Sequence, residues 1–183
     1  MGYSVETYYA PLVLTLRSLP IPVICAVNGV AMLVRANIAL ACDIVLAKQI
    51  GQLRRSVLQA RPDPRYGRHL ASATPGGPRA PMGMAMLGEK ISAETAEQWG
   101  LIWRCVSDEG LMDEATTMAA HLAIAPTKGL AFTKRAIAAS YANTLPEQLK
   151  LEGEMMRELG YSHDYREGVA AFIAKRPPHF TGE

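Results

Sequence analysis

The side chains best suited to chemistry, the cysteines and histidines, are few and widely spaced along the chain. Cys25, Cys42 and Cys105 each lie inside an apolar run, which predicts buried, reduced thiols and argues against a disulfide framework or a zinc site. The histidines show no metal-ligand spacing; they are His69, His121, His163 and His179. We therefore expect no bound metal.

Positive charge is concentrated in one segment. Residues 48–81 carry seven Lys and Arg against one acid, Asp63, so this segment has a net charge of +6 and the rest of the chain −4. Pro62 and Pro64 flank Asp63, which makes it a turn residue. A nucleic-acid site would interleave aromatic side chains on an ordered face, and no such face is predicted here. We expect no nucleic-acid partner.

Length and composition are those of a globular protein. The 183 residues suit one domain, and 49% of them are hydrophobic and 20% charged. No apolar run is long enough to span a membrane, and the N-terminus lacks the features of a secretory signal. We expect a soluble, cytoplasmic protein that does not bind membranes.

The elements that must position a site begin with a helix over residues 5–19, kinked at Pro11 and ended by Pro20. Buried strands are predicted over residues 23–27 and 43–47, with a small-residue helix over residues 30–41 between them, which makes a βαβ unit. Residues 49–81 contain five prolines and four glycines and show no periodicity, so an irregular segment is predicted.

Order returns after this segment. A helix is predicted from residue 82, ending near Gly88, and a second one over residues 92–100, which Ser92 caps. A strand is expected over residues 101–106. Helical spacing then continues to the end of the chain, over residues 111–124, 126–141, 145–159 and 164–175.

Three segments resemble the crotonase superfamily of enoyl-CoA hydratases and isomerases. They are Ile21-Pro-Val-Ile-Cys-Ala-Val-Asn-Gly-Val-Ala31 with Asn37-Ile-Ala-Leu-Ala-Cys-Asp43, the stretch from Leu87 to Trp103, and Arg166-Glu-Gly-Val-Ala-Ala-Phe-Ile-Ala-Lys-Arg-Pro-Pro-His-Phe180. The sequences of these segments are most similar to those of the ring-epoxide isomerases of phenylacetate catabolism. The resemblance covers residues 1–48 and 82–183.

The resemblance implies an α/β fold. It predicts a partial crotonase (ClpP-like) ββα-spiral core over residues 1–110 and a C-terminal helical trimerisation region over residues 111–183. Family members carry further residues ahead of position 1, including the first oxyanion-hole strand, so Met1 is expected to be an internal start.

The same resemblance assigns site residues. Two backbone N–H groups should hold the thioester oxyanion, and Val34 is expected to supply one of them at a helix start, where the helix dipole favours negative charge. Ala31 and Asn37 are expected to contact substrate. The family places glycines around this point, whereas this chain has Met32-Leu-Val-Arg35, whose bulk should disturb the loop.

The proton-transferring acid of the family is missing. Hydratases carry a glutamate where this chain has Asn37, which speaks against a two-carboxylate hydratase. The remaining acid, an aspartate in a Pro-Asp-x-Gly-Gly motif, would act as general base and then acid. Arg65 occupies its place, and Asp63 is offset by two positions.

A shifted reading frame would account for the unusual segment. If the family's usual amino-acid sequence for this region is encoded in GC-rich codons and translated one base earlier, it gives Arg-Pro-Asp-Pro followed by Tyr-x-Arg-His-Leu. This chain has Arg61-Pro-Asp-Pro64 followed by Tyr66-Gly-Arg-His-Leu70. We infer two compensating frameshifts around residues 49–81, which also explain the arginines.

Two C-terminal residues match family positions that contact the CoA nucleotide of a neighbouring subunit, namely Phe172 and Lys175, whose charge would meet phosphate. Without the resemblance, Phe172 would be helix core and Lys175 a solvated cation at a helix C-terminus. Both interpretations stay open at this point.

The predicted function is isomerisation of an unsaturated or ring-epoxide acyl-CoA thioester in phenylacetate degradation. No cofactor is expected, since CoA is part of the substrate, and a homotrimer or hexamer is the expected assembly. One alternative is a catalytically inactive remnant able at most to oligomerise, which the missing acid favours. Another is an enoyl-CoA hydratase of fatty-acid β-oxidation.

Overall fold

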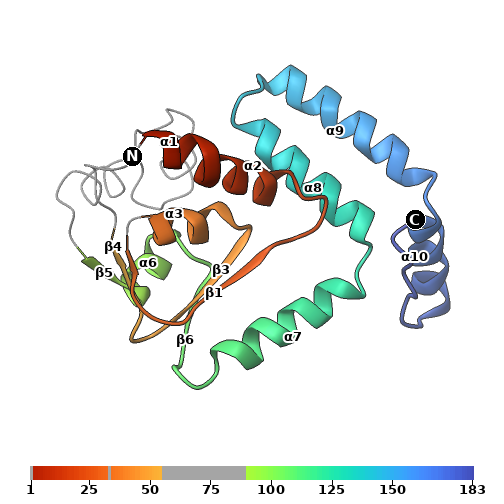
Figure 1. Ribbon diagram of the computed structural model, residues 1–183. Coiled ribbons are helices and arrows are strands. Elements are labelled where there is room, and N and C mark those ends of the chain that lie inside the picture. The colour runs from red at the N-terminus through yellow and green to blue at the C-terminus, as the bar shows by residue number, and fades with distance from the viewer. Residues whose placement is uncertain (1, 33, 55–89) are drawn as a thin grey trace. The chain divides into compact units, whose positions relative to one another are not determined.

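The computed structural model describes residues 2–32, 34–54 and 90–183 (Figure 1). These residues divide into two compact units, one made of Met1–Ser18 with Val23–Thr116 and the other of Leu19–Pro22 with Thr117–Glu183. None of the helices described is long and apolar enough to cross a membrane.

The first unit begins with a continuous helical stretch that changes its winding. It runs as α1 (Gly2–Ser4), a π-helical turn (Val5–Tyr9) and α2 (Ala10–Ser18). Ala10 N–H donates to Val5 O, a bond that spans one residue more than in an α-helix. Pro11 has no N–H to donate to Thr7, and its ring crowds that carbonyl, so the winding is disturbed before the proline.

A parallel sheet forms the centre of this unit. Strand β3 (Ile44–Lys48) pairs on one side with β1 (Ile24–Val27) and on the other with β6 (Arg104–Val106). The central side chains of β3, from Val45 to Ala47, are accordingly buried, and Leu46 has no exposed surface. The strands predicted over residues 23–27 and 43–47 are confirmed, while the strand expected over residues 101–106 is shorter and begins at Arg104.

A second sheet was not predicted. It joins β2 (Ala31–Met32) in parallel to β4 (Gln52–Arg54), which pairs in antiparallel fashion with β5 (Lys90–Ser92). Two predictions were therefore wrong. The helix expected from residue 30 starts only at Val34, because Ala31 and Met32 are paired in this sheet, and residues 52–54 form a strand inside the segment expected to be irregular. The rest of that segment and the helix predicted from residue 82 lie outside the described residues.

Helices cover the core of the first unit. They are α3 (Val34–Ala41), α6 (Ala93–Gln98) and the start of α7 (Leu111–Ala123). Ser92 caps α6 by accepting a hydrogen bond from Thr95 N–H at 3.1 Å, as predicted. Small residues let these helices approach the strands closely; the buried cluster contains Val27, Ala36, Ala39, Val45, Ala47, Ile91, Ala93, Ala96, Leu101 and Ile102.

The second unit is helical, as predicted. It contains α8 (Thr127–Ser140), α9 (Leu145–Gly160) and α10 (His163–Ala174). Glu147 accepts a hydrogen bond from Thr144 N–H at 2.8 Å and so caps α9, and Gln148 Nε2 donates to Ala136 O at 3.1 Å and links α9 to α8. Within the part of this unit that is described, the buried apolar side chains are Ala131, Met155 and Ala171.

Candidate active site

The candidate oxyanion site lies where β1 leads through Asn28 and Gly29 into β2 and then α3. Val34 is the first residue of α3, so its backbone N–H belongs to the helical turn whose N–H groups have no partner in the helix. Those groups and the helix dipole favour a negatively charged ligand oxygen. The structure therefore places the predicted N–H at a helix start.

The other two predicted substrate-contacting residues of this unit lie close by in the chain. Ala31 is in β2, and Asn37 is half-buried one turn after Val34 in α3. The Asn37 side chain is an amide, which can donate or accept hydrogen bonds but cannot take a proton from carbon. Arg65 lies outside the described residues.

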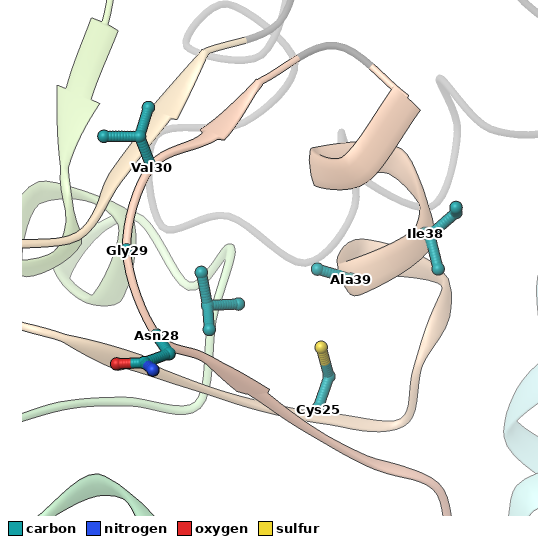
Figure 2. Close-up of a pocket in the computed structure, with 7 residues that line it drawn as sticks. Cys25, Asn28, Gly29, Val30, Ile38 and Ala39 are labelled. Carbon is teal, nitrogen blue, oxygen red and sulfur yellow. The ribbon is translucent and has the colours of Figure 1, made fainter.

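A cavity of about 500 Å³ opens between β1, the Asn28-Gly29 connection and α3 (Figure 2). Its lining includes Val30 and Ile38, the immediate neighbours of Ala31 and Asn37. Its walls are mostly apolar; the lining residues are Cys25, Val27, Asn28, Gly29, Val30, Ile38 and Ala39. A space of this size and character can accept a small apolar group.

Hydrogen bonds to side-chain and backbone oxygens hold the segments next to this cavity in place. Asp43 Oδ2 accepts a hydrogen bond from Val23 N–H at 2.8 Å, and Asp43 N–H donates to Val23 O at 3.0 Å. Gly51 closes a tight turn after β3, with its N–H 2.7 Å from Lys48 O. A Cβ on Gly51 would lie 2.6 Å from that same oxygen and 3.5 Å from Gly29 O, so the turn requires a glycine.

Three features of this region were missed by sequence reasoning. Gly51 was assigned to an irregular segment, although a glycine shortly after a buried strand is a recognised turn signal. Asp43 was assigned only to a strand. Cys25 and Cys42 were treated as separate core thiols, whereas a hydrogen bond from the Cys42 thiol lowers the pKa of Cys25 to about 7, against the opposing effect of burial. None of the three cysteines is in a disulfide.

The remaining predicted site residues belong to the second unit. Phe172 is 86% exposed on α10, so the alternative that it is helix core is wrong. Lys175 follows α10 in the left-handed region, at φ 53°, and its N–H donates to carbonyl groups of the last helical turn. Both side chains are thus available to a partner or ligand.

The chain after Lys175 folds back along α10. Arg176 forms an ion pair with Glu167, which also accepts a hydrogen bond from His179 N–H at 2.8 Å. Asp164, only 4% exposed, accepts hydrogen bonds from Thr181 N–H at 2.8 Å and Gly182 N–H at 2.9 Å. The last eight residues are therefore tied to the helix that carries Phe172.

These contacts lower the pKa of both acids. The Arg176 guanidinium, helped by His179 N–H, lowers the pKa of Glu167 to about 2. For Asp164 the largest single effect is burial, which raises the pKa, but the hydrogen bonds from Thr181 and Gly182, with further ones from His163 and the Thr181 hydroxyl, outweigh it and lower the pKa. Both carboxylates are therefore ionised at neutral pH.

Comparison with known proteins supports the fold and the family. The family model described as "Enoyl-CoA hydratase/isomerase" matches residues 3–183. The 1,2-epoxyphenylacetyl-CoA isomerase of Escherichia coli (strain K12) is 50% identical over 185 residues, which cover 100% of this chain and 70% of that protein.

Solved structures agree. An enoyl-CoA hydratase from Polaromonas sp. JS666 superposes with a TM-score of 0.88 at 31% identity, covering 98% of this chain and 70% of the other. An enoyl-CoA hydratase from Bacillus anthracis gives a TM-score of 0.86 at 27% identity, covering 100% and 72%. The predicted α/β crotonase fold is confirmed, and the chain belongs to the enoyl-CoA hydratase/isomerase family of the crotonase superfamily.

Proposed function

We propose that the reaction of this site is isomerisation of an unsaturated or ring-epoxide acyl-CoA thioester, in phenylacetate degradation. The observation that carries the proposal is the 50% identity to the epoxyphenylacetyl-CoA isomerase along the whole chain. Asn37 supports it over hydration, because an amide cannot serve as the second acid–base group that activation of water requires. No metal or organic cofactor is required.

Each residue has a role in this proposal. The N–H of Val34 stabilises the thioester oxygen as it gains negative charge when a proton leaves the acyl chain. The apolar cavity beside α3 receives the acyl group. Phe172 and Lys175 contribute to CoA binding, through stacking of the exposed ring and through phosphate charge, respectively.

The second candidate is a protein of the same family that no longer catalyses. The observation that favours it is Arg65, which stands where the family has its proton-transferring aspartate. A guanidinium is always protonated at neutral pH and cannot accept a proton from carbon. Such a chain retains at most thioester binding and self-association, and we favour this candidate for the sequence as it stands.

A shift of reading frame across residues 49–81 would reconcile the two candidates, because the unshifted sequence would encode the family's acid and the shifted one does not. The alignment with the isomerase has 185 positions for the 183 residues of this chain, so the unusual segment does not result from a large deletion. Strand β4 does not contradict the shift, because its ladder joins backbone groups that every residue except proline supplies. Resequencing the gene through codon 82 decides whether the corrected reading frame encodes the family's usual sequence in this segment.

The functional experiment compares the unchanged chain with designed variants. Arg65→Asp restores the acid, Arg65→Ala is its matched control, and Leu33→Gly with Arg35→Gly restores small residues on both sides of Val34. We measure isomerisation of an epoxide or enoyl thioester and, separately, thioester binding by calorimetry. We expect binding without turnover in the unchanged chain and turnover only where the acid is restored.

Two outcomes would each reject one candidate. Turnover by the unchanged chain would reject the inactive candidate and show that catalysis does not need an acid at position 65. The assigned reaction would be rejected if the variant that combines Arg65→Asp with Leu33→Gly and Arg35→Gly binds the thioester and still does not isomerise it.

A further inference from the structure

Two thiols of the first unit, Cys25 in β1 and Cys42 directly after α3, are hydrogen-bonded to each other. Cys25 points from β1 toward α3, where Ala39 lies (Figure 2). Cys42 follows α3 directly, and its thiol donates to Ile38 O at 3.5 Å, which turns its sulfur back toward the last turn of the helix. Two hydrogen bonds between Val23 and Asp43, one accepted by the Asp43 carboxylate and one between backbone groups, hold the two segments together at this point.

The hydrogen bond between the thiols makes them chemically unequal. A thiolate at Cys25 accepts the proton of Cys42, which lowers the pKa of Cys25 to about 7 although burial opposes the charge. In the neutral pair the same proton is directed to Ile38 O, so forming the thiolate requires only that the Cys42 S–H rotates. Of the two thiols, Cys25 lines the cavity and Cys42 does not, so Cys25 is the one that an entering molecule can reach.

Cys105 provides a contrast within the same unit. Burial raises its pKa, and the nearby carboxylates of Glu94, Glu97 and Asp108 raise it further because they repel a thiolate. Cys105 N–H is hydrogen-bonded to Glu97 Oε2 at 3.2 Å, which confirms that an acid lies beside it. At neutral pH Cys105 therefore stays protonated and unreactive.

Access to Cys25 is provided by the cavity of about 500 Å³ that it lines. The neighbouring walls are the side chains of Val27, Val30, Ile38 and Ala39, which favour an uncharged, apolar molecule over a charged one. The nucleophile thus lies at the edge of a space that a small organic compound can enter.

We propose that Cys25 and Cys42 form a modification site for small apolar electrophiles of the conjugated-carbonyl class, with Cys25 as the reacting thiol. The Cys25 sulfur bonds to the β-carbon, the π electrons of the C=C bond move onto the α-carbon and the carbonyl, and the α-carbon takes a proton from water. The proton lost by Cys25 goes to solvent, so no oxidant or reductant is consumed. This reaction needs no acid–base residue of the isomerisation, but it takes place in the cavity that we assign to the acyl group.

The test uses N-ethylmaleimide as the electrophile, at limiting concentration and pH 7, followed by proteolysis and mass spectrometry of the three cysteine peptides. A pKa two units below the ordinary value of 9.0 raises the thiolate fraction more than it reduces nucleophilicity. We therefore expect Cys25 to react at least about fivefold faster than Cys105. Equal rates at the two cysteines would overturn the proposal.

Matched variants test the role of Cys42. Cys42→Ala removes the donor and should slow labelling of Cys25 severalfold at pH 7, whereas Cys42→Ser keeps a donor and should preserve most of the rate. Cys105→Ser should leave Cys25 labelling unchanged. Circular dichroism confirms that each variant is folded, and if Cys42→Ala is not, the serine variant and the ratio of Cys25 to Cys105 labelling still decide. Unchanged labelling of Cys25 in folded Cys42→Ala, or its loss in folded Cys42→Ser, would reject the paired site.

Discussion

Arg176 and Glu167 form a two-pronged contact, with Nη1 2.6 Å from Oε1 and Nη2 2.8 Å from Oε2. The geometry is that of a bidentate guanidinium–carboxylate pair, in which two parallel hydrogen bonds define both distance and orientation. Because the pair joins the residue after Lys175 to the middle of α10, it directs the chain back along the helix.

The Arg176–Glu167 pair predicts a response to acid. Glu167 has a pKa of about 2 in the folded chain against an ordinary value of 4.5, so its contribution to stability is fully present above about pH 4.5 and is lost as the pH falls toward 2. NMR chemical shifts of the His179 amide should follow this titration. In Glu167→Gln the amide shift should lack this step; a step that persists in the variant would assign it to another group.

Asp164 should matter more for stability than an exposed acid of the same unit. Replacing it with Ala removes the charged acceptor of the Thr181 and Gly182 N–H groups, which should cost about 1 to 3 kcal/mol. Glu154→Ala, on the exposed side of α9, is the control and should change the free energy of unfolding by less than about 0.5 kcal/mol. Urea unfolding measures both, and equal effects would show that the C-terminal residues do not stabilise the unit.

Gly51 and Gly29 form a matched pair for testing the turn beside the cavity. Gly51→Ala places a Cβ 2.6 Å from Lys48 O, so the backbone must shift, at a cost of about 1 to 3 kcal/mol. A Cβ on Gly29 meets no atom within 4 Å, so Gly29→Ala should stay within about 0.5 kcal/mol of the unchanged chain. Thermal melts compare the two, and a tolerated Gly51→Ala would show that the turn can relax.

The exposed apolar side chains of the last two helices predict self-association. Tyr161 is 80%, Phe172 86% and Ile173 76% exposed, a concentration of apolar surface that a protein–protein interface would cover. Phe172→Glu should shift the chain toward the monomer in analytical ultracentrifugation. Lys150→Glu, which adds charge to an exposed position of α9 outside this cluster, should leave the association state unchanged; a monomeric parent chain would end this hypothesis.

Much of the fold could be predicted because its elements carry local signals. The strand over residues 23–27 is a run of apolar, mostly β-branched residues, and the C-terminal helices combine periodic spacing with cap residues such as Thr144. The sheet of β2, β4 and β5 could not be predicted. Its strands are two or three residues long, too short to show a period, and their partners are distant in sequence.

The candidate site also has features that could be predicted from the sequence and features that could not. Val34 was assigned from the resemblance, because the Asn-Gly turn after the buried strand indicated only that a helix follows, and the start expected at residue 30 was four residues too early. The relationship between Cys25 and Cys42 could not be seen, because sixteen residues separate them and only the βαβ geometry brings a residue of the first strand beside the end of the following helix. Phe172 was assigned from resemblance, since its spacing alone indicated the core and the structure shows it exposed.

The π-helical turn at Val5–Tyr9 is equivalent to a single extra residue accommodated in an otherwise regular helix. Each residue of an α-helix rotates the chain by about 100°. Shortening this turn by one residue would therefore leave α2 in place but rotate Tyr3 and its neighbours by about that angle around the helix axis. The face that the first turn of the chain presents is thus determined by one surplus residue ahead of Pro11.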